Sequence, residues 1–277
     1  MEILDEEVHR NHEFGRSMNV TIIMNSWTGQ PSYPIVRCAR VGKGRIRLTQ
    51  TSHSGHKEQE MPANENATQL WWIPLAMTDA RRPDFSPEGT VPRVWLTPQR
   101  PTLEIPYFLA GEDESNWILI NGEMSSYVRV LYDEHNWRLI ARQLMINHTV
   151  IPQVTRVQLL EDAFALATME KLDIGIVLNL MEYLKLVKDE FVSTTITFHV
   201  AVMEGRVMNR NATLYELLKV FCRSQSFTKV NSLYDSFSWT GLHGQFNSQR
   251  WRRTISQQFG SFRRKRHAGQ RHLRPPE

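Results

Sequence analysis

The chain has 277 residues, 41% of them hydrophobic, and a formal net charge of +4. These values allow one large or two medium domains with a sizeable core, and they exclude disorder throughout the chain. Of the 33 Lys and Arg, nine lie in residues 250–277 beside one acid, which leaves 24 bases and 28 acids elsewhere. The net positive charge of the chain therefore comes from this C-terminal tail. Nucleic acid is not a favoured partner of the rest of the chain.

The sequence gives conflicting indications of the cellular compartment. No apolar run reaches about 18 residues, so no transmembrane helix is predicted, and the acidic first residues do not resemble a signal peptide. Four candidate N-glycosylation sequons nevertheless favour the secretory pathway. They begin at Asn19, Asn66, Asn147 and Asn211. We therefore expect the beginning of a longer secretory protein to be missing.

The first part of the chain is predicted to hold one helix and then short strands. Residues 20–27 have apolar side chains at helical spacing, and Gly29 ends that pattern. Gly42-Lys-Gly44 predicts a hairpin turn, and Pro74 indicates an edge strand or a bulge. Seven candidate strands with turns between them favour an antiparallel β-sandwich. They are residues 33–40, 45–50, 70–77, 93–99, 103–107, 117–121 and 126–133.

From about residue 134 the apolar spacing becomes helical. Asn136 is the expected N-cap of a first helix, Thr155 and Gln158 form an expected capping box for a second, and Asp173 is the expected N-cap of a third. The expected buried positions are Trp137, Ile140, Ala141, Leu144, Leu159, Leu160, Ala163, Phe164, Ala167, Ile174, Val177, Leu178, Met181 and Leu184.

Consecutive short amphipathic helices suggest an α-helical solenoid. A further capping box is predicted at residues 213–216. Residues 191–202 are rich in β-branched side chains, yet their neighbours lead us to expect a helix. Residues 246–277 are predicted to be mostly disordered, with one short helix near residues 247–259.

Short motifs follow one another in a fixed order along the chain. Trp27-Thr28 precedes Tyr33-Pro34, and a Trp-Ile-Pro-Leu run covers residues 72–75. A Tyr-x-Arg-Val-x-Tyr-Asp pattern covers residues 127–133, and Asn136-Trp137 follows it after two residues. The last motifs are Ile151-Pro152 and the Arg-x-Gln-Leu-x-x-Asp-Ala-Phe pattern of residues 156–164.

In this order and spacing, the motifs resemble the zinc aminopeptidase N family from about residue 5 to about residue 237. The resemblance implies three segments: the end of the catalytic domain at 1–30, the β-sandwich at 31–133 and the start of the HEAT-like helical C-terminal domain at 134–245. The basic tail at 246–277 is predicted from its charge and resembles no part of the family. The resemblance implies a parent enzyme that is secreted or at the cell surface and hydrolyses N-terminal residues from peptides.

The motifs for catalysis in that family are absent from this sequence. The family holds zinc through H-E-x-x-H, because two His one helical turn apart reach one ion, with the help of a distant Glu. Here the only His-Glu pair is His12-Glu13, and Arg16 stands where the second His is needed. The Gly-x-Met-Glu-Asn loop is missing too, since Gly122-Glu-Met-Ser-Ser has no carboxylate after Met. We predict no catalytic residue and no metal ligand in this chain.

Several residues allow a functional and a structural interpretation. Arg129 and Arg156 could line the peptide cavity of the parent enzyme or pair with acids between domains, and we favour the second. His53 and His56 are interpreted as solvated loop residues and not as metal ligands. The basic run at residues 263–266 could be a processing site, a nuclear signal or an RNA-binding patch, although a disordered tail is favoured.

Two hypotheses for function follow from the sequence. The first is a truncated, inactive member of the family, present as a fragment, a splice form or an incomplete gene model. The second is a non-catalytic interaction module that pairs with full-length aminopeptidases through the open face of its helices, or with acidic partners through its tail.

Overall fold

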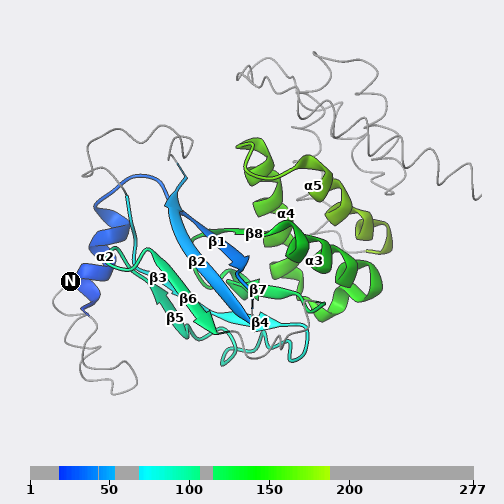
Figure 1. Ribbon diagram of the computed structural model, residues 1–277, viewed down its shortest axis with the longest axis horizontal. Helices are drawn as coiled ribbons and strands as arrows, with labels where there is room; N and C mark the ends of the chain where they lie inside the picture. Colours follow the sequence, from blue (N-terminus) through cyan, green and yellow to red (C-terminus); the bar gives the residue numbers. More distant parts are fainter. Residues whose placement is uncertain (1–18, 43, 54–68, 107–114, 188–277) are drawn as a thin grey trace, which may run out of the picture. The chain divides into compact units, whose positions relative to one another are not determined.

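A computed structural model describes residues 19–42, 44–53, 69–106 and 115–187 (Figure 1). The fold is mixed α and β, and it divides into two compact units, the first ending at Asn136 and the second beginning at Trp137. None of the helices in these ranges is long and apolar enough to cross a membrane. The predictions for residues 191–202, 213–216 and 246–277 lie outside the described residues.

The first helix is α2, Val20–Thr28, as predicted. The Asn19 side chain caps it by accepting a hydrogen bond from Ile22 N at 2.9 Å. Gly29 ends it, and a Cβ at Gly29 would lie 2.7 Å from the Asn25 carbonyl oxygen, so a larger residue would clash there. The Trp27 indole donates to the Trp72 carbonyl at 3.0 Å, which holds α2 beside the strand that follows Trp72.

The largest sheet has the strand order β6-β2-β1-β8. Strands β1, Pro34–Arg40, and β2, Arg45–Ser52, form the predicted antiparallel hairpin. Gly42 and Gly44 turn it with φ angles of 82° and 66°, a region that favours glycine. On the other side of β2, β6, Thr102–Pro106, is also antiparallel.

Strand β8, Arg129–Tyr132, is parallel to β1, which corrects the prediction of a purely antiparallel arrangement. A parallel pair requires a long connection. Here the strands between β2 and β8 form this connection. They lead the chain to the free edge of β1, where β8 runs in the same direction as β1.

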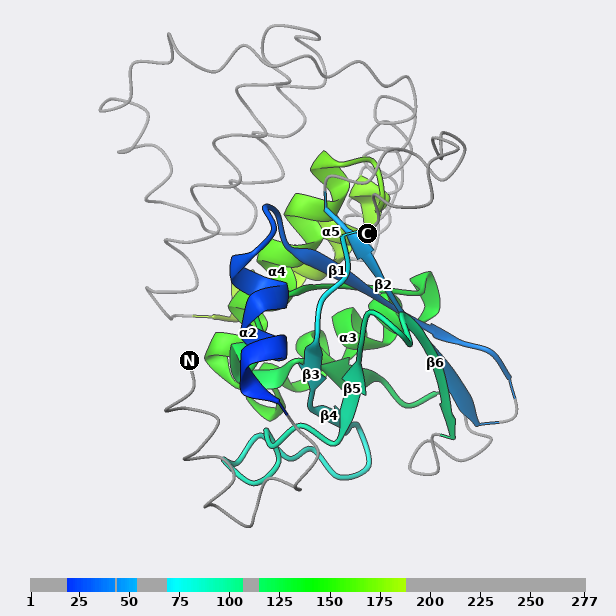
Figure 2. The same cartoon turned by 90° about the vertical axis from the view of Figure 1, so that its left-hand side faces the viewer.

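Two further sheets have two strands each. Strand β3, Ile73–Leu75, pairs with β5, Val94–Leu96, and Figure 2 shows this pair beside α2. Strand β4, Met77–Asp79, pairs with β7, Ile118–Ile120. The run at residues 70–77 was predicted as one strand, but it contains β3 and only the first residue of β4, because these two strands pair with different partners. The small open sheets are consistent with a β-sandwich.

The second strand, β2, carries an uncharged polar side chain into the core of the first unit. Ile46, Leu48 and Gln50 alternate with more exposed residues and are buried. The Gln50 side chain accepts from Trp71 N at 2.9 Å and donates to Trp71 O at 3.0 Å. It thereby satisfies buried backbone groups just before β3 that no neighbouring strand satisfies.

The helical segment begins with α3, Glu134–Asn147, followed by α4, Gln153–Thr168, and α5, Ile174–Met181. Short 3₁₀ turns follow α3 and α5, at His148–Val150 and Glu182–Leu186. All the predicted apolar positions are buried, although Leu184 lies in the second of these turns. These helices do not establish a solenoid, which stays a prediction.

Of the three predicted caps that lie in the described part of the chain, one is confirmed. Asp173 caps α5, since its side chain accepts from Gly175 N at 2.7 Å. Asn136 lies inside α3, and Asp133 accepts its N–H at 2.8 Å, so the cap prediction was three residues late. Thr155 and Gln158 are buried inside α4, which begins after Pro152, and they form no capping box. Pro152 precedes the first residue of α4 and has an extended backbone. The helix therefore begins before Thr155, the residue that the predicted capping box placed at its start.

Candidate functional site

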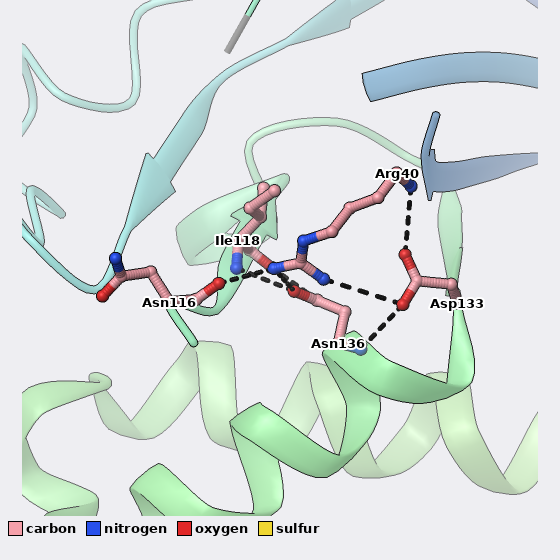
Figure 3. Close-up of polar contacts among 5 residues, drawn as sticks. All are labelled: Arg40, Asn116, Ile118, Asp133 and Asn136. Atoms are coloured by element: carbon pink, nitrogen blue, oxygen red, sulfur yellow. Dashed lines mark hydrogen bonds and ion pairs between the residues drawn. The ribbon is translucent and has the colours of Figure 1, made fainter. Parts of the chain in front are cut away.

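Long-range polar contacts concentrate at the end of β1, beside β7 and the start of α3, and we call this group the junction cluster (Figure 3). Its members are Arg40, Asn116, Ile118, Asp133 and Asn136. Asp133 accepts from Arg40 N at 3.1 Å, and the two side chains form an ion pair at 3.7 Å. Arg40 Nη2 donates to Asn116 O and to Asn136 Oδ1.

Asn136 completes the junction cluster by acting as a substitute for a strand. Its Oδ1 accepts from Ile118 N at 2.9 Å, and its Nδ2 donates to Ile118 O at 2.8 Å. A neighbouring β-strand would satisfy the same two groups. The cluster therefore fixes β1, β7 and the first turn of α3 to one another within the first unit. All but one of these hydrogen bonds join a side chain to a backbone group, so these residues hold the backbone in position.

Arg129, one of the two predicted arginine sites, lies in an aromatic cluster on β8. Its guanidinium stands over the Tyr33 ring, 5.6 Å from the centroid, and Nε donates to the Tyr33 hydroxyl at 3.2 Å. The Tyr33 ring also lies 4.5 Å from the ring of His53 and 6.0 Å from that of Tyr127. Tyr127 is 74% exposed and contacts Trp27 of α2.

Arg156, the other predicted arginine site, lies in α4 and is only 7% exposed. Its Nη1 is 3.2 Å from His148 Nδ1. Since a guanidinium can only donate, His148 Nδ1 is the acceptor and the imidazole is neutral. Burial, and then the positive charge of Arg156, hold the pKa of His148 below its usual 6.5. Arg129 belongs to the first unit and Arg156 to the second, and each is described by its own contacts.

We expect the His148–Arg156 contact to make stability depend on pH. The folded chain favours neutral His148, whereas the unfolded chain protonates it near the usual pKa, so acid favours unfolding. This contribution is complete above pH 6.5 and is lost as pH falls through the lower folded pKa. Urea unfolding from about pH 8 to about pH 5 should show a smaller acid-induced loss of stability in His148→Gln.

The matched control for this prediction is His135→Gln, which changes an exposed His of α3. It should keep the full pH dependence of the parent chain. If the stability of His148→Gln depended on pH as strongly as that of the unmodified chain, the His148–Arg156 contact would not be the source of the pH dependence.

The remaining predicted site residues are four sequon asparagines and two histidines. Asn19 and Asn147 are exposed, whereas Asn66, Asn211 and His56 lie outside the described residues. Within the described ranges no group of three or more His, Cys, Asp or Glu could hold a metal ion, so these residues do not fit a zinc site. Burial, followed by the charge of Asp133, raises the pKa of Cys38 to about 12, so this thiol stays protonated.

Asp133 and Asn136 were predicted as motif residues, but their partners were not. Arg40 lies 96 residues before Asn136 and Asn116 lies 20 before it, and no local pattern connects such distant positions. The available signal was Arg40 itself, a charged residue at the end of an alternating strand. Gln50, at an inward position of β2, carried a similar signal.

Comparison with known proteins places these motifs in a family. The family described as "ERAP1-like C-terminal domain" matches residues 117–268, more than half of the chain. The thyrotropin-releasing hormone-degrading ectoenzyme of Mus musculus is 33% identical over 191 residues, covering 67% of this chain and 17% of that enzyme. Aminopeptidase N of Plutella xylostella is 30% identical over 167 residues, covering 60% of this chain and 17% of that protein. Glutamyl aminopeptidase of Rattus norvegicus is 27% identical over 228 residues, covering 80% of this chain and 22% of that protein.

The fold and motifs thus match the C-terminal part of the proteins of an aminopeptidase family. The chain belongs to the aminopeptidase N family, as its motifs predicted. It spans about one-sixth of the length of the mouse and moth relatives.

Proposed function

We propose that this chain forms a non-catalytic part of a zinc aminopeptidase that removes N-terminal residues from peptides. The match of residues 117–268 to the ERAP1-like C-terminal domain carries this proposal. The 277 residues contain no H-E-x-x-H, so the ion that activates the attacking water in this family would be held by other residues. The described units supply shape and rigidity, through the junction cluster and the buried helices.

The proposed location is the secretory pathway, the cell surface or the extracellular space. One relative is named an ectoenzyme, and this chain carries four sequons. The alternative interaction module relies on residues 191–277, which lie outside the described ranges. It stays a prediction, with co-purification of a full-length aminopeptidase as its test.

The purified full chain is expected to bind no stoichiometric zinc and to hydrolyse no aminoacyl-p-nitroanilide. Metal analysis after dialysis against zinc, together with an anilide panel, measures both properties. The control is a full-length relative, such as the mouse ectoenzyme, purified in the same way and assayed on its own peptide. Zinc-dependent turnover by this chain, abolished by a chelator, would refute the proposal.

A chimaera tests the structural role directly. The mouse relative carrying the matching residues of this chain in place of its aligned segment should be secreted, loaded with zinc and active. A secreted, zinc-loaded chimaera without turnover would show that these residues cannot replace a functional part of the enzyme.

A further inference from the structure

The largest sheet packs against the rest of the first unit on one side and presents a polar surface on the other. On the packed side, Gln50 of β2 donates to the Trp71 carbonyl at 3.0 Å. Successive side chains of a strand point to opposite faces of its sheet. Arg45, Arg47 and Thr49 therefore point away from Trp71, and both arginines are exposed.

The neighbouring strands β1 and β6 extend this polar surface on either side of β2 (Figure 1). In the register of the sheet, Glu104 of β6 is the partner of Arg47. Thr49 has Thr102 of β6 on one side and Arg37 of β1 on the other. Residues directly opposite each other on paired strands share a face. We call this surface the arginine face, and its members are Arg37, Arg45, Arg47, Thr49, Thr102 and Glu104.

The arginine face has more positive than negative charge. Glu104 Oε1 accepts from Arg47 Nε at 2.8 Å, and Glu104 Oε2 lies 3.8 Å from Arg45 Nε. One carboxylate thus holds two guanidinium groups in position but neutralises only one of them. Arg37 is exposed, and no described residue forms an ion pair or a hydrogen bond with its side chain. Three arginines and one glutamate leave a net charge of +2 on this face.

The spacing of the three arginines suits a chain of anionic groups better than a single ion. Arg45 and Arg47 lie two residues apart on β2, which separates them by about 7 Å. Arg37 is the diagonal neighbour of Arg47, since the register partner of Arg47 is Ala39. Such diagonal neighbours lie about 7–8 Å apart. Each guanidinium presents paired N–H donors to an oxyanion, so successive anionic groups of one polymer can meet all three.

We propose that the arginine face binds a linear sulfated polysaccharide. Thr49 and Thr102 place hydroxyl groups beside the charges, where they can exchange hydrogen bonds with the hydroxyls of a sugar ring. An acidic peptide is a poorer match, because the six side chains are all charged or hydroxylated and offer a peptide no apolar anchor. The inference rests on the proposed extracellular location, where such polysaccharides occur, and not on peptidase activity.

The test uses the full chain and a heparin-derived dodecasaccharide as the probe. The nine Lys and Arg of residues 250–277 also attract this probe, so all the variants compared keep that tail. Arg37→Gln combined with Arg47→Gln should weaken binding about tenfold and reduce its dependence on salt concentration. The control combines Arg81→Gln with Arg82→Gln, which removes two exposed charges from the loop after β4. It should weaken binding by no more than about twofold.

Glu104→Gln provides a second measurement with the opposite sign. It removes the carboxylate of the arginine face, so the dodecasaccharide should bind about threefold more tightly. Glu88→Gln, which removes an exposed carboxylate elsewhere in the first unit, should have a smaller effect.

Two results would overturn the proposal. In one, the two double arginine variants bind the dodecasaccharide equally well, so the arginine face plays no part. In the other, polyglutamate binds as tightly as the dodecasaccharide and is weakened equally by the loss of Arg37 and Arg47, so the face does not select a sulfated sugar. Neither result would alter the zinc and anilide measurements, so the two proposals fail separately.

Discussion

Replacing Asn136 with leucine should lower the free energy of unfolding of the first unit by about 3 kcal/mol. Leucine has nearly the same size but no polar atoms. Asn136 is buried, and Ile118, whose N–H and carbonyl it satisfies, is 1% exposed. Both backbone groups would stay buried without partners, and Arg40 would lose one acceptor. Urea unfolding followed by circular dichroism measures the change.

Asn25→Leu is the control for this prediction, since it makes the same substitution at an exposed helical position in α2. Its effect should stay within about 0.5 kcal/mol. If Asn136→Leu is as mild as Asn25→Leu, the side chain of Asn136 does not replace a strand partner, and the junction cluster has no stabilising role.

Features decided by nearby residues could be predicted from the sequence. The hairpin turn at Gly42 and Gly44 requires positive φ angles, and glycine adopts them at no steric cost. The helical spacing of Trp137, Ile140 and Leu144 also correctly located a buried face of α3. In both cases the physical cause lies within a few residues of its effect.

Features decided by distant partners could not be predicted in this way. The parallel pairing of β8 with β1 depends on the path of the whole chain between them. The division of residues 70–77 into two strands depends on β5 and β7. Similarly, the cap of α3 moved to Asp133 because Asn136 is engaged with Ile118, a contact that a local capping pattern does not contain.

The aminopeptidase motifs nevertheless coincide with these distant contacts. Asp133 and Asn136 belong to two successive motifs, and both are members of the junction cluster. Arg129, from the same strand motif as Asp133, contacts Tyr33 of an earlier motif. In the first unit, some residues of the motifs that identified the family therefore hold separate strands together. In this chain, these motif residues take part in packing contacts between separate strands.

Trp71→Ala should be the most destabilising single change in the first unit, with a loss of about 4 kcal/mol in the free energy of unfolding. Trp71 has no exposed surface, and its ring centroid lies 6.3 Å from that of Trp27. Alanine would leave a cavity there while keeping the two backbone hydrogen bonds to Gln50. The expected loss therefore reports packing alone, and urea unfolding measures it.

Tyr127→Ala is the matched control, because it removes an aromatic ring that also contacts Trp27 but is 74% exposed. It should cost about 1 kcal/mol or less, since little apolar surface leaves the core. Similar losses for both variants would mean that Trp71 is not at the centre of the core. A large loss for Trp71→Ala alone would show that the buried Trp71 ring contributes strongly to the stability of the first unit, while Gln50 holds the Trp71 backbone in position.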